Sequence, residues 1–171
     1  VAVIAQDGLR RMFQEQEDVF YYITVMNENY EHPDMPKGAE ADIIKGMYPF
    51  RKGGDGKLRV QLLGSGTIFR EVIAAAALLR NDWGVEADLW GCPSFTLLGR
   101  DGMAAARSNL LHPTAKPVRS HVEACLADRE GPVIAATDYI RAYAEQIRAY
   151  VPRRYKVLGT DGFGRSDTRE K

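Results

Sequence analysis

Two stretches combine glycine with small or charged residues in the order that phosphate-binding loops use. In "LLGSGTIFRE", residues 62–71, a predicted strand, a glycine turn and a helix follow one another, and amides at a helix N-terminus can hold an anion. The dinucleotide pattern G-x-G-x-x-G fails because Phe69 stands at its last position, and no Lys-Ser/Thr pair makes a P-loop. These residues therefore favour a tight turn with Thr67 as the helix cap.

The second stretch is "GFGRSD", residues 162–167, which could hold an anion through its amides and Arg165. Its glycines would equally permit a sharp turn against a neighbouring domain, and we favour this structural role. Asp167 and Glu170 then have the spacing of a helix N-cap and its N3 partner, so a helix is expected to begin where the sequence stops.

One set of residues resembles a metal-binding motif, namely Gly54-Asp55-Gly56 and Asn81. Thiamine diphosphate enzymes bind the diphosphate and its metal through Gly-Asp-Gly followed by Asn, with the Asp at a strand end directly before a helix. Here Asp55 is predicted at a hairpin tip and Asn81 closes a helix. We therefore reject a metal site at these residues.

The remaining residues that could do chemistry are scattered. His32 and His112 each precede a proline, and His121 lies in a predicted helix beside Glu123, so no metal-binding spacing appears. No serine lies in a G-x-S-x-G elbow, and neither cysteine has an evident base. We assign no catalytic, cofactor-binding or metal-binding residue to this segment, and expect the segment alone to bind no cofactor.

Composition excludes several classes of partner. Lys plus Arg and Asp plus Glu are each 23, so no net field attracts nucleic acid or anionic lipid. No apolar run approaches the roughly 20 residues of a membrane span. The two cysteines, Cys92 and Cys125, lack CxxC spacing and are predicted to be buried, reduced thiols of a cytoplasmic protein.

The first part of the sequence predicts a helix, a strand and a connector. Apolar residues from Val1 to Phe13 recur at helical intervals. "VFYYITVMN", residues 19–27, is a continuous run that predicts a strand covered on both faces. Two prolines then exclude regular structure from "ENYEHPDMPKG". A short helix is expected over residues 39–45, and residues 47–64 are expected to form a hairpin with its tip at 53–56.

Strands and helices alternate in the rest of the sequence, which predicts βαβ units and a mostly parallel sheet. We expect strands at 58–63, 85–92, 132–137 and 155–158, and helices at 67–81, 94–111, 118–127 and 140–150. The predicted fold class is α/β, a mostly parallel sheet flanked by helices. Ligand-binding loops should gather at the carboxyl edge of the sheet, at residues 64–67, 93–94, 138–139 and 161–165.

Several stretches together carry a family resemblance, among them "VQLLGSGTIFREV", "PSFTLLGRDG", "NLLHP", "ATDYIRAYAEQIRAYVP" and "YKVLGTDGFGRSDTRE". They resemble the homodimeric bacterial type of pyruvate dehydrogenase decarboxylating component, a thiamine diphosphate enzyme of the transketolase superfamily. The resemblance covers nearly the whole chain. It implies that residues 1–30 end a pyrimidine-binding domain, that 31–55 form a connector and hairpin, and that 56–171 form a transketolase C-terminal-like domain, truncated at its end.

The resemblance also implies what the parent enzyme does. Thiamine diphosphate and Mg²⁺ would serve the decarboxylation of pyruvate, and the product would reductively acetylate a lipoyl group of the acetyltransferase component. The residues that hold the cofactor would lie before Val1. The segment itself would supply scaffold, dimer contacts and the rim of the active-site funnel, and would be inactive alone.

Two other readings stay open at the level of sequence. One is a fragment of a transketolase-type ketol transferase, and the other is a free-standing, non-catalytic α/β domain that docks a partner through the "GFGRSD" edge. The departures from the family forms, such as the charged "RKGGDGKLR" stretch, leave the exact relative undecided.

Overall fold

The computed structural model describes residues 1–25 and 31–162 of the chain. Their centre is a five-stranded sheet with strand order β1-β3-β2-β4-β5. Its strands are β1 (Tyr48–Arg51), β2 (Leu58–Gly64), β3 (Val85–Gly91), β4 (Val133–Ile140) and β5 (Tyr155–Thr160). Only β1 pairs antiparallel, with β3, and the other pairs are parallel. The predicted α/β fold with a mostly parallel sheet is confirmed.

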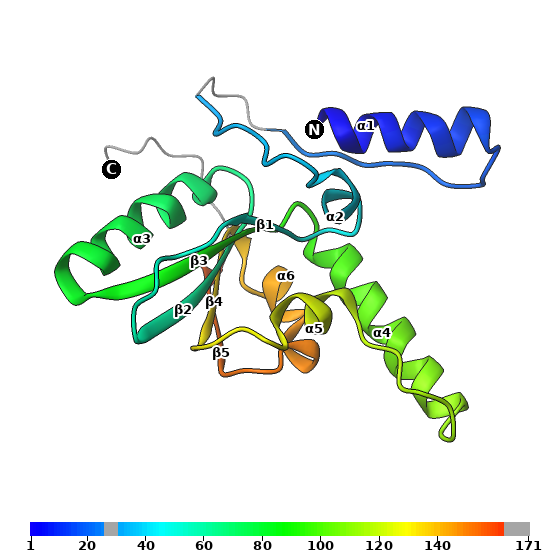
Figure 1. Ribbon diagram of the computed structural model, residues 1–171. Helices are drawn as coiled ribbons and strands as arrows, with labels where there is room; N and C mark the ends of the chain where they lie inside the picture. Colours follow the sequence, from blue (N-terminus) through cyan, green and yellow to red (C-terminus); the bar gives the residue numbers. More distant parts are fainter. Residues whose placement is uncertain (26–30, 163–171) are drawn as a thin grey trace.

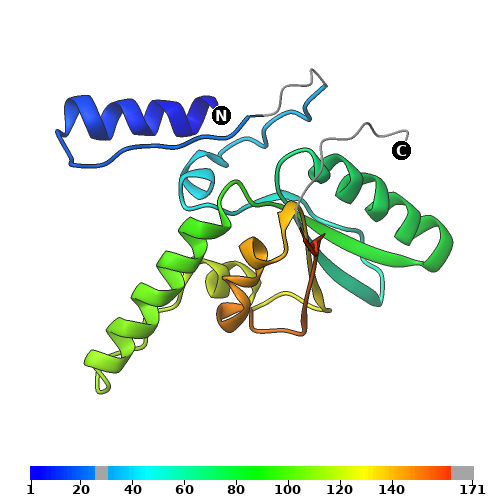
Figure 2. The ribbon, with the colours of Figure 1, turned by 180° about the vertical axis from the view of Figure 1, so that it is seen from behind.

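Helices cover the two faces of the sheet unequally. One face carries α3 (Ile68–Trp83), and the other carries α4 (Phe95–Leu111), α5 (His121–Leu126), α6 (Ala142–Glu145) and the 3₁₀ turn Arg148–Tyr150, as Figures 1 and 2 show from opposite sides. Each face has its own apolar core. The core on the α4 side is the larger and includes Met47, Trp90, Leu98 and Ile147.

The apolar side chains of strand β2 divide between the two cores. Val60 and Leu62 join the α3 side, and Leu63 joins the other. The strand also has two polar residues, Arg59, which is partly exposed, and Gln61, which is fully buried. Because both faces of the strand are covered, a polar side chain such as Gln61 must find its hydrogen-bond partners inside the protein.

Local signals set the ends of the longer helices. Gly84 follows α3 with φ +61°, the left-handed conformation that ends many helices. Ser94 caps α4 by accepting a hydrogen bond from the Leu97 amide at 3.1 Å. Ser120 and Glu123 form a capping box at α5, so that helix begins three residues later than its predicted start at Val118.

The N-terminal segment departs from its prediction. Helix α1 (Ala2–Leu9) and the π-turn Arg10–Gln14 are present, but the described residues of the predicted strand, 19–25, lie in no sheet. Tyr21 holds this extended stretch on α1 by donating to Asp7 Oδ2 at 2.5 Å, while Phe20 and Tyr22 are exposed. The strand prediction is wrong here because no neighbouring strand pairs with the run; residues 26 and 27 lie outside the described residues.

The predicted hairpin is also wrong. Strand β1 pairs with β3 and not with β2. The loop glycines explain this, because the Gly53 and Gly54 amides donate to Asp88 and Glu86 of β3 at 2.8 Å and 2.7 Å. These bonds draw the chain after β1 across β3 before it enters β2, and the short helix α2 (Glu40–Ile44) precedes β1 as expected.

The helix predicted over residues 140–150 is broken into pieces. Strand β4 runs on to Ile140, which pairs with Thr160, and only α6 and a 3₁₀ turn follow. Apolar residues of this segment still pack in the core, since Ala144 and Ile147 are fully buried. Pairing with β5 therefore overrides helix periodicity at the start of the segment. Among the described residues, no helix combines the length and apolarity needed to cross a membrane.

Candidate functional site: the carboxyl edge of the sheet

Side chains from two neighbouring strand ends meet at the carboxyl edge, where the sequence placed its candidate ligand loops. Ser65 Oγ donates to Thr137 Oγ1 at 3.2 Å, and Thr67 Oγ1 donates to Asp138 Oδ2 at 3.0 Å. The Tyr139 amide donates to Thr137 Oγ1, also at 3.2 Å. These polar groups satisfy one another, so the turn after β2 and the end of β4 form one bonded unit.

Asp138 occupies the place that a phosphate would take in a phosphate-binding loop. A Cβ on Gly66, which has φ +58°, would lie 3.1 Å from both carboxylate oxygens of Asp138. The carboxylate thus sits against the glycine turn at the N-terminus of α3, where negative charge is favoured. This geometry supports the tight turn over an anion cradle.

The predicted capping role of Thr67 is only partly right. Thr67 occupies the N-cap position of α3, but its side chain makes no capping hydrogen bond and donates to Asp138 instead. The sequence could not show this, because Asp138 is 71 residues away along the chain.

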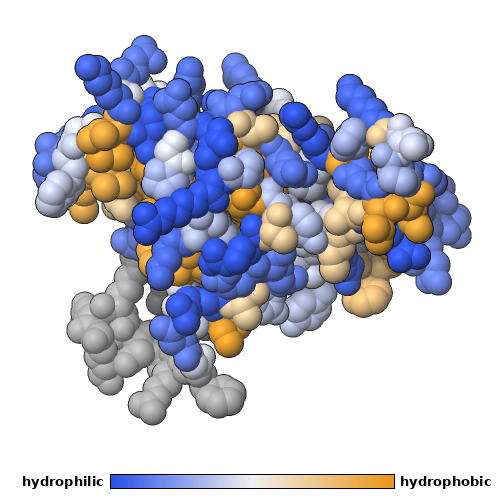
Figure 3. Space-filling model, turned by 90° about the horizontal axis from the view of Figure 1, so that it is seen from below, coloured by the Kyte–Doolittle hydropathy of each residue, from blue (hydrophilic) through white to orange (hydrophobic). Residues whose placement is uncertain are grey.

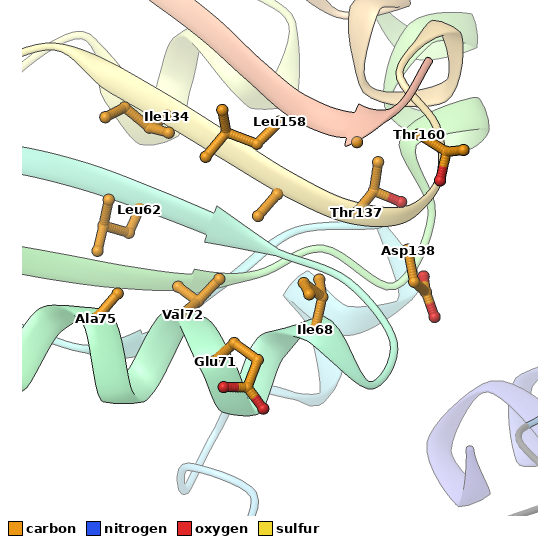
Figure 4. A pocket seen from close by; sticks show the side chains of 12 residues that line it. Leu62, Ile68, Glu71, Val72, Ala75, Ile134, Thr137, Asp138, Leu158 and Thr160 are labelled. Atoms are coloured by element: carbon orange, nitrogen blue, oxygen red, sulfur yellow. The ribbon is translucent and has the colours of Figure 1, made fainter. Parts of the chain in front are cut away.

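An apolar groove of about 490 Å³ opens beside this unit, between α3 and strands β4 and β5. Figure 4 shows aliphatic side chains of Leu62, Val72 and Ile134 lining it, with Asp138 at one end and Glu71 on α3 beside Val72. Leu158 of β5 is 53% exposed there. The charged groups among its lining residues are carboxylates, so the groove fits apolar side chains and repels an anion such as a 2-oxo acid or a diphosphate.

The rejected metal motif lies at the opposite end of β2, in a different network. Gly54 is bound to Glu86, and Asp55 is exposed in the loop. Nearby, Asp88 accepts from Gly53, from Arg59 at 2.8 Å and from Gln61 at 3.0 Å.

Burial by itself raises the pKa of Asp88, but the hydrogen bonds from the Gly53 amide and Gln61 and the charge of Arg59 together hold the pKa below its usual range. The carboxylate is therefore a charged structural anchor. It is also paired with Arg59, whose side chain is 12% exposed.

His121 and the two cysteines are engaged in packing, whereas His32 and His112 are exposed in loops. His121 Nε2 lies 2.8 Å from the Met47 carbonyl, and Cys125 Sγ is 3.6 Å from the same nitrogen. Burial raises the pKa of the Cys125 thiol to about 11 and that of the fully buried Cys92 still further. Both thiols stay protonated at neutral pH, which is unsuited to a nucleophile. Cys125 is half-buried, so the predicted burial is complete only for Cys92.

Part of the predicted edge lies outside the described residues. Arg165 and most of "GFGRSD" fall in 163–171, as do Asp167 and Glu170. The described start of this loop is tied to the edge by an ion pair between Asp161 and Arg141. Residues 93–94 join the same edge, because the Cys92 amide donates to the Gly64 carbonyl at 2.8 Å.

The family follows from comparison with known proteins. Residues 46–171 match the model of the transketolase-like TK C-terminal domain. The chain belongs to this family. Residues 1–33 match the middle domain of the pyruvate dehydrogenase E1 component, so the transketolase-like domain is preceded by the end of a second domain.

The transketolase-like chain is similar over its length to pyruvate dehydrogenase E1 components. It is 72% identical to that of Cupriavidus necator, with 100% of this chain and 19% of the relative covered. Identity is 62% with the Pseudomonas aeruginosa protein (100% and 20% covered) and 52% with that of Escherichia coli K12 (99% and 19% covered). The chain spans about a fifth of the length of these relatives, and the resemblance to the bacterial decarboxylating component is confirmed.

Proposed function

We propose that this chain is part of a pyruvate dehydrogenase E1 component that works in the cytoplasm as a homodimer. The parent would decarboxylate pyruvate with thiamine diphosphate and Mg²⁺ and pass the acetyl unit to a lipoyl group of the acetyltransferase component. Similarity over the entire chain to proteins of that name is the observation that carries the proposal. It favours pyruvate over the sugar phosphates of a ketol transferase.

The described residues do not fit the cofactor. The Gly54-Asp55-Gly56 amides and carboxylate do not stand before a helix, and Gly54 is already bound to Glu86. The glycine turn before α3 holds Asp138, and the groove beside it carries carboxylates. We assign the cofactor site to other parts of the parent and derive no chemical step within this segment.

The segment is proposed to act as scaffold and to contribute contacts in the dimer. Two observations support this role. The polar groups at the carboxyl edge are bonded to each other rather than presented to a substrate. The groove beside α3 offers apolar surface of the kind that subunit and domain contacts bury.

The proposal is tested with the full-length parent and the 171-residue chain side by side. With thiamine diphosphate, Mg²⁺ and an artificial electron acceptor, the parent should release carbon dioxide from [1-¹⁴C]pyruvate, and the chain alone should release none above buffer. Xylulose 5-phosphate with ribose 5-phosphate serves as the comparison substrate pair. Turnover of the sugar phosphates without pyruvate turnover would refute the assignment, and activity of the 171-residue chain alone would refute the scaffold role.

A further inference from the structure

The helix α4 and the loop behind it form a projecting surface, residues 100–119, which we name the α4 arm. Figure 1 shows α4 extending away from the sheet, with the following segment returning beside it. Every residue from Leu110 to Arg119 is exposed. In the space-filling view from below, apolar and hydrophilic residues lie side by side at the end of the molecule where α4 projects (Figure 3).

One stripe of α4 alternates cationic and apolar side chains. Arg100, Met103, Arg107 and Leu110 stand at positions i, i+3, i+7 and i+10, which share one side of a helix. Met103 is 60% exposed and Leu110 is 78% exposed. At 1.5 Å per residue the stripe is about 15 Å long, and Leu111 borders it.

The opposite side of α4 is locked against the fold, so the helix cannot rotate to bury these side chains. Leu98 is fully buried, and Gly102 lies so close to Tyr150 that a Cβ would stand 2.2 Å from the ring. Only glycine permits that approach. The stripe is therefore presented to the outside by the packing of the inner face.

The loop behind α4 is held as a second, ordered part of the same surface. Asn109 donates to the Val118 carbonyl at 2.9 Å and accepts from the Val118 amide at 2.7 Å. Asp101 accepts from the His121 amide at 2.6 Å. These bonds fix residues 112–119 although their side chains are exposed, and a surface ordered before binding loses less entropy when a partner docks.

The charge of the arm is predominantly positive in a chain whose net charge is zero, and its one acidic residue, Asp101, accepts from the His121 amide. Residues 102–120 contain no Asp or Glu, while Arg107, Lys116 and Arg119 carry positive charge. None of these three, nor Arg100, forms an ion pair with another residue of the described chain. The surface complements a partner that presents carboxylates around apolar side chains.

We propose that the α4 arm is a docking site for a different protein subunit, not a second copy of this chain. The matching patch on that subunit would present carboxylates around apolar side chains. The proposal rests on the proposed function, which makes the parent one component of an assembly. A protein partner fits better than a lipid bilayer, because the stripe alternates charge with apolar side chains instead of presenting one continuous apolar face. It also fits better than nucleic acid, since residues 100–119 contain no Phe, Tyr or Trp for stacking on bases.

The test uses the full-length parent and the purified acetyltransferase component as the probe, with affinity measured by biolayer interferometry at low and moderate salt. Arg107→Glu together with Lys116→Glu, or Leu110→Asp alone, should weaken binding about tenfold or more. The control is Lys52→Glu with Lys57→Glu, which makes the same charge change on exposed residues outside the arm and should leave affinity within twofold. Affinity of the unmodified parent should fall as salt rises.

Four results would each overturn the proposal: unchanged affinity in the arm variants, no binding of the probe at all, dissociation of the parent dimer by the same substitutions, or binding of the arm to phosphatidylserine vesicles. Dissociation of the dimer would show that a second copy covers the arm, and vesicle binding would show that lipid does. Pyruvate decarboxylation with an artificial acceptor, measured on every variant, should stay within twofold. Because that assay needs no acetyltransferase, its failure in the unmodified parent would refute the proposed function separately from the docking site.

Discussion

At the scale of single residues, Gln61 is the polar centre of the sheet. It is fully buried, donates to Asp88 Oδ2 and the Glu130 carbonyl, both at 3.0 Å, and accepts from Trp90 Nε1 at 2.9 Å. A buried polar group is tolerated when all its partners are present, and it is costly when one is removed.

Gln61→Leu should lower the free energy of unfolding by about 2–3 kcal/mol, because it leaves the buried Trp90 N–H without an acceptor. Urea unfolding followed by the fluorescence of Trp90, in a Trp83→Phe background, measures this. Gln14→Leu, at an exposed position, is the matched control and should change stability by less than about 0.5 kcal/mol. Equal effects of both substitutions would show that the Gln61 network contributes nothing.

Asp88 predicts a specific pH dependence. Because its pKa in the folded chain is below the unfolded value of about 3.9, the carboxylate stabilises the fold above about pH 4, and this contribution is lost as the pH falls through the lower folded pKa. Asp88→Asn should lower stability at pH 7 by about 2–3 kcal/mol and flatten its decline between about pH 5 and pH 2. Asp128→Asn, at an exposed carboxylate, is the control; an acid limb equally steep in Asp88→Asn and in the unmodified chain would contradict the assignment.

At the scale of elements, the contact of α4 with the segment after β4 depends on glycine. The Gly102 position leaves no room for a methyl group beside Tyr150, although alanine is the better helix former. Gly102→Ala should therefore lower the free energy of unfolding by about 1–3 kcal/mol, against the helix propensity.

Adding Tyr150→Leu to Gly102→Ala should recover part of that loss, because it removes the ring that the methyl group meets. A double-mutant cycle from urea unfolding gives the coupling between the two positions. Additive effects in the cycle would mean that the steric contact does not limit the packing of α4.

At the scale of the whole molecule, a side-chain hydrogen bond joins the N-terminal segment to the sheet domain. Tyr139 at the carboxyl edge donates to Thr24 Oγ1 at 2.8 Å across 115 residues of sequence. Tyr139→Phe should raise the rate of limited proteolysis within residues 20–25 several-fold while β4 and β5 stay uncut, because an exposed hydrogen bond contributes about 1 kcal/mol. Tyr143→Phe is the control, and equal proteolysis of both variants would show that this bond does not hold the segment.

The sequence predicted the central part of the fold well, because β2, β3, α3 and α4 carry local signals that agree with their tertiary surroundings. It failed where partners distant in the chain decide the outcome. Strand β1 joins β3 because Gly53 and Gly54 are bound by Asp88 and Glu86, and β4 extends to Ile140 because β5 pairs with it. The candidate edge was located correctly, but the Thr67–Asp138 bond that closes it has no signature in either stretch alone.

By itself the sequence determined the family and the alternation of strands and helices, since these depend on residue type and local order. Only the tertiary structure decided that Asp138 fills the glycine turn, that the Gly-Asp-Gly loop is bound to β3, and that α4 turns a cationic and apolar stripe outward. The physical reason is that each of these features depends on groups that packing brings together from distant parts of the chain. No single segment of the sequence contains both partners of such a contact.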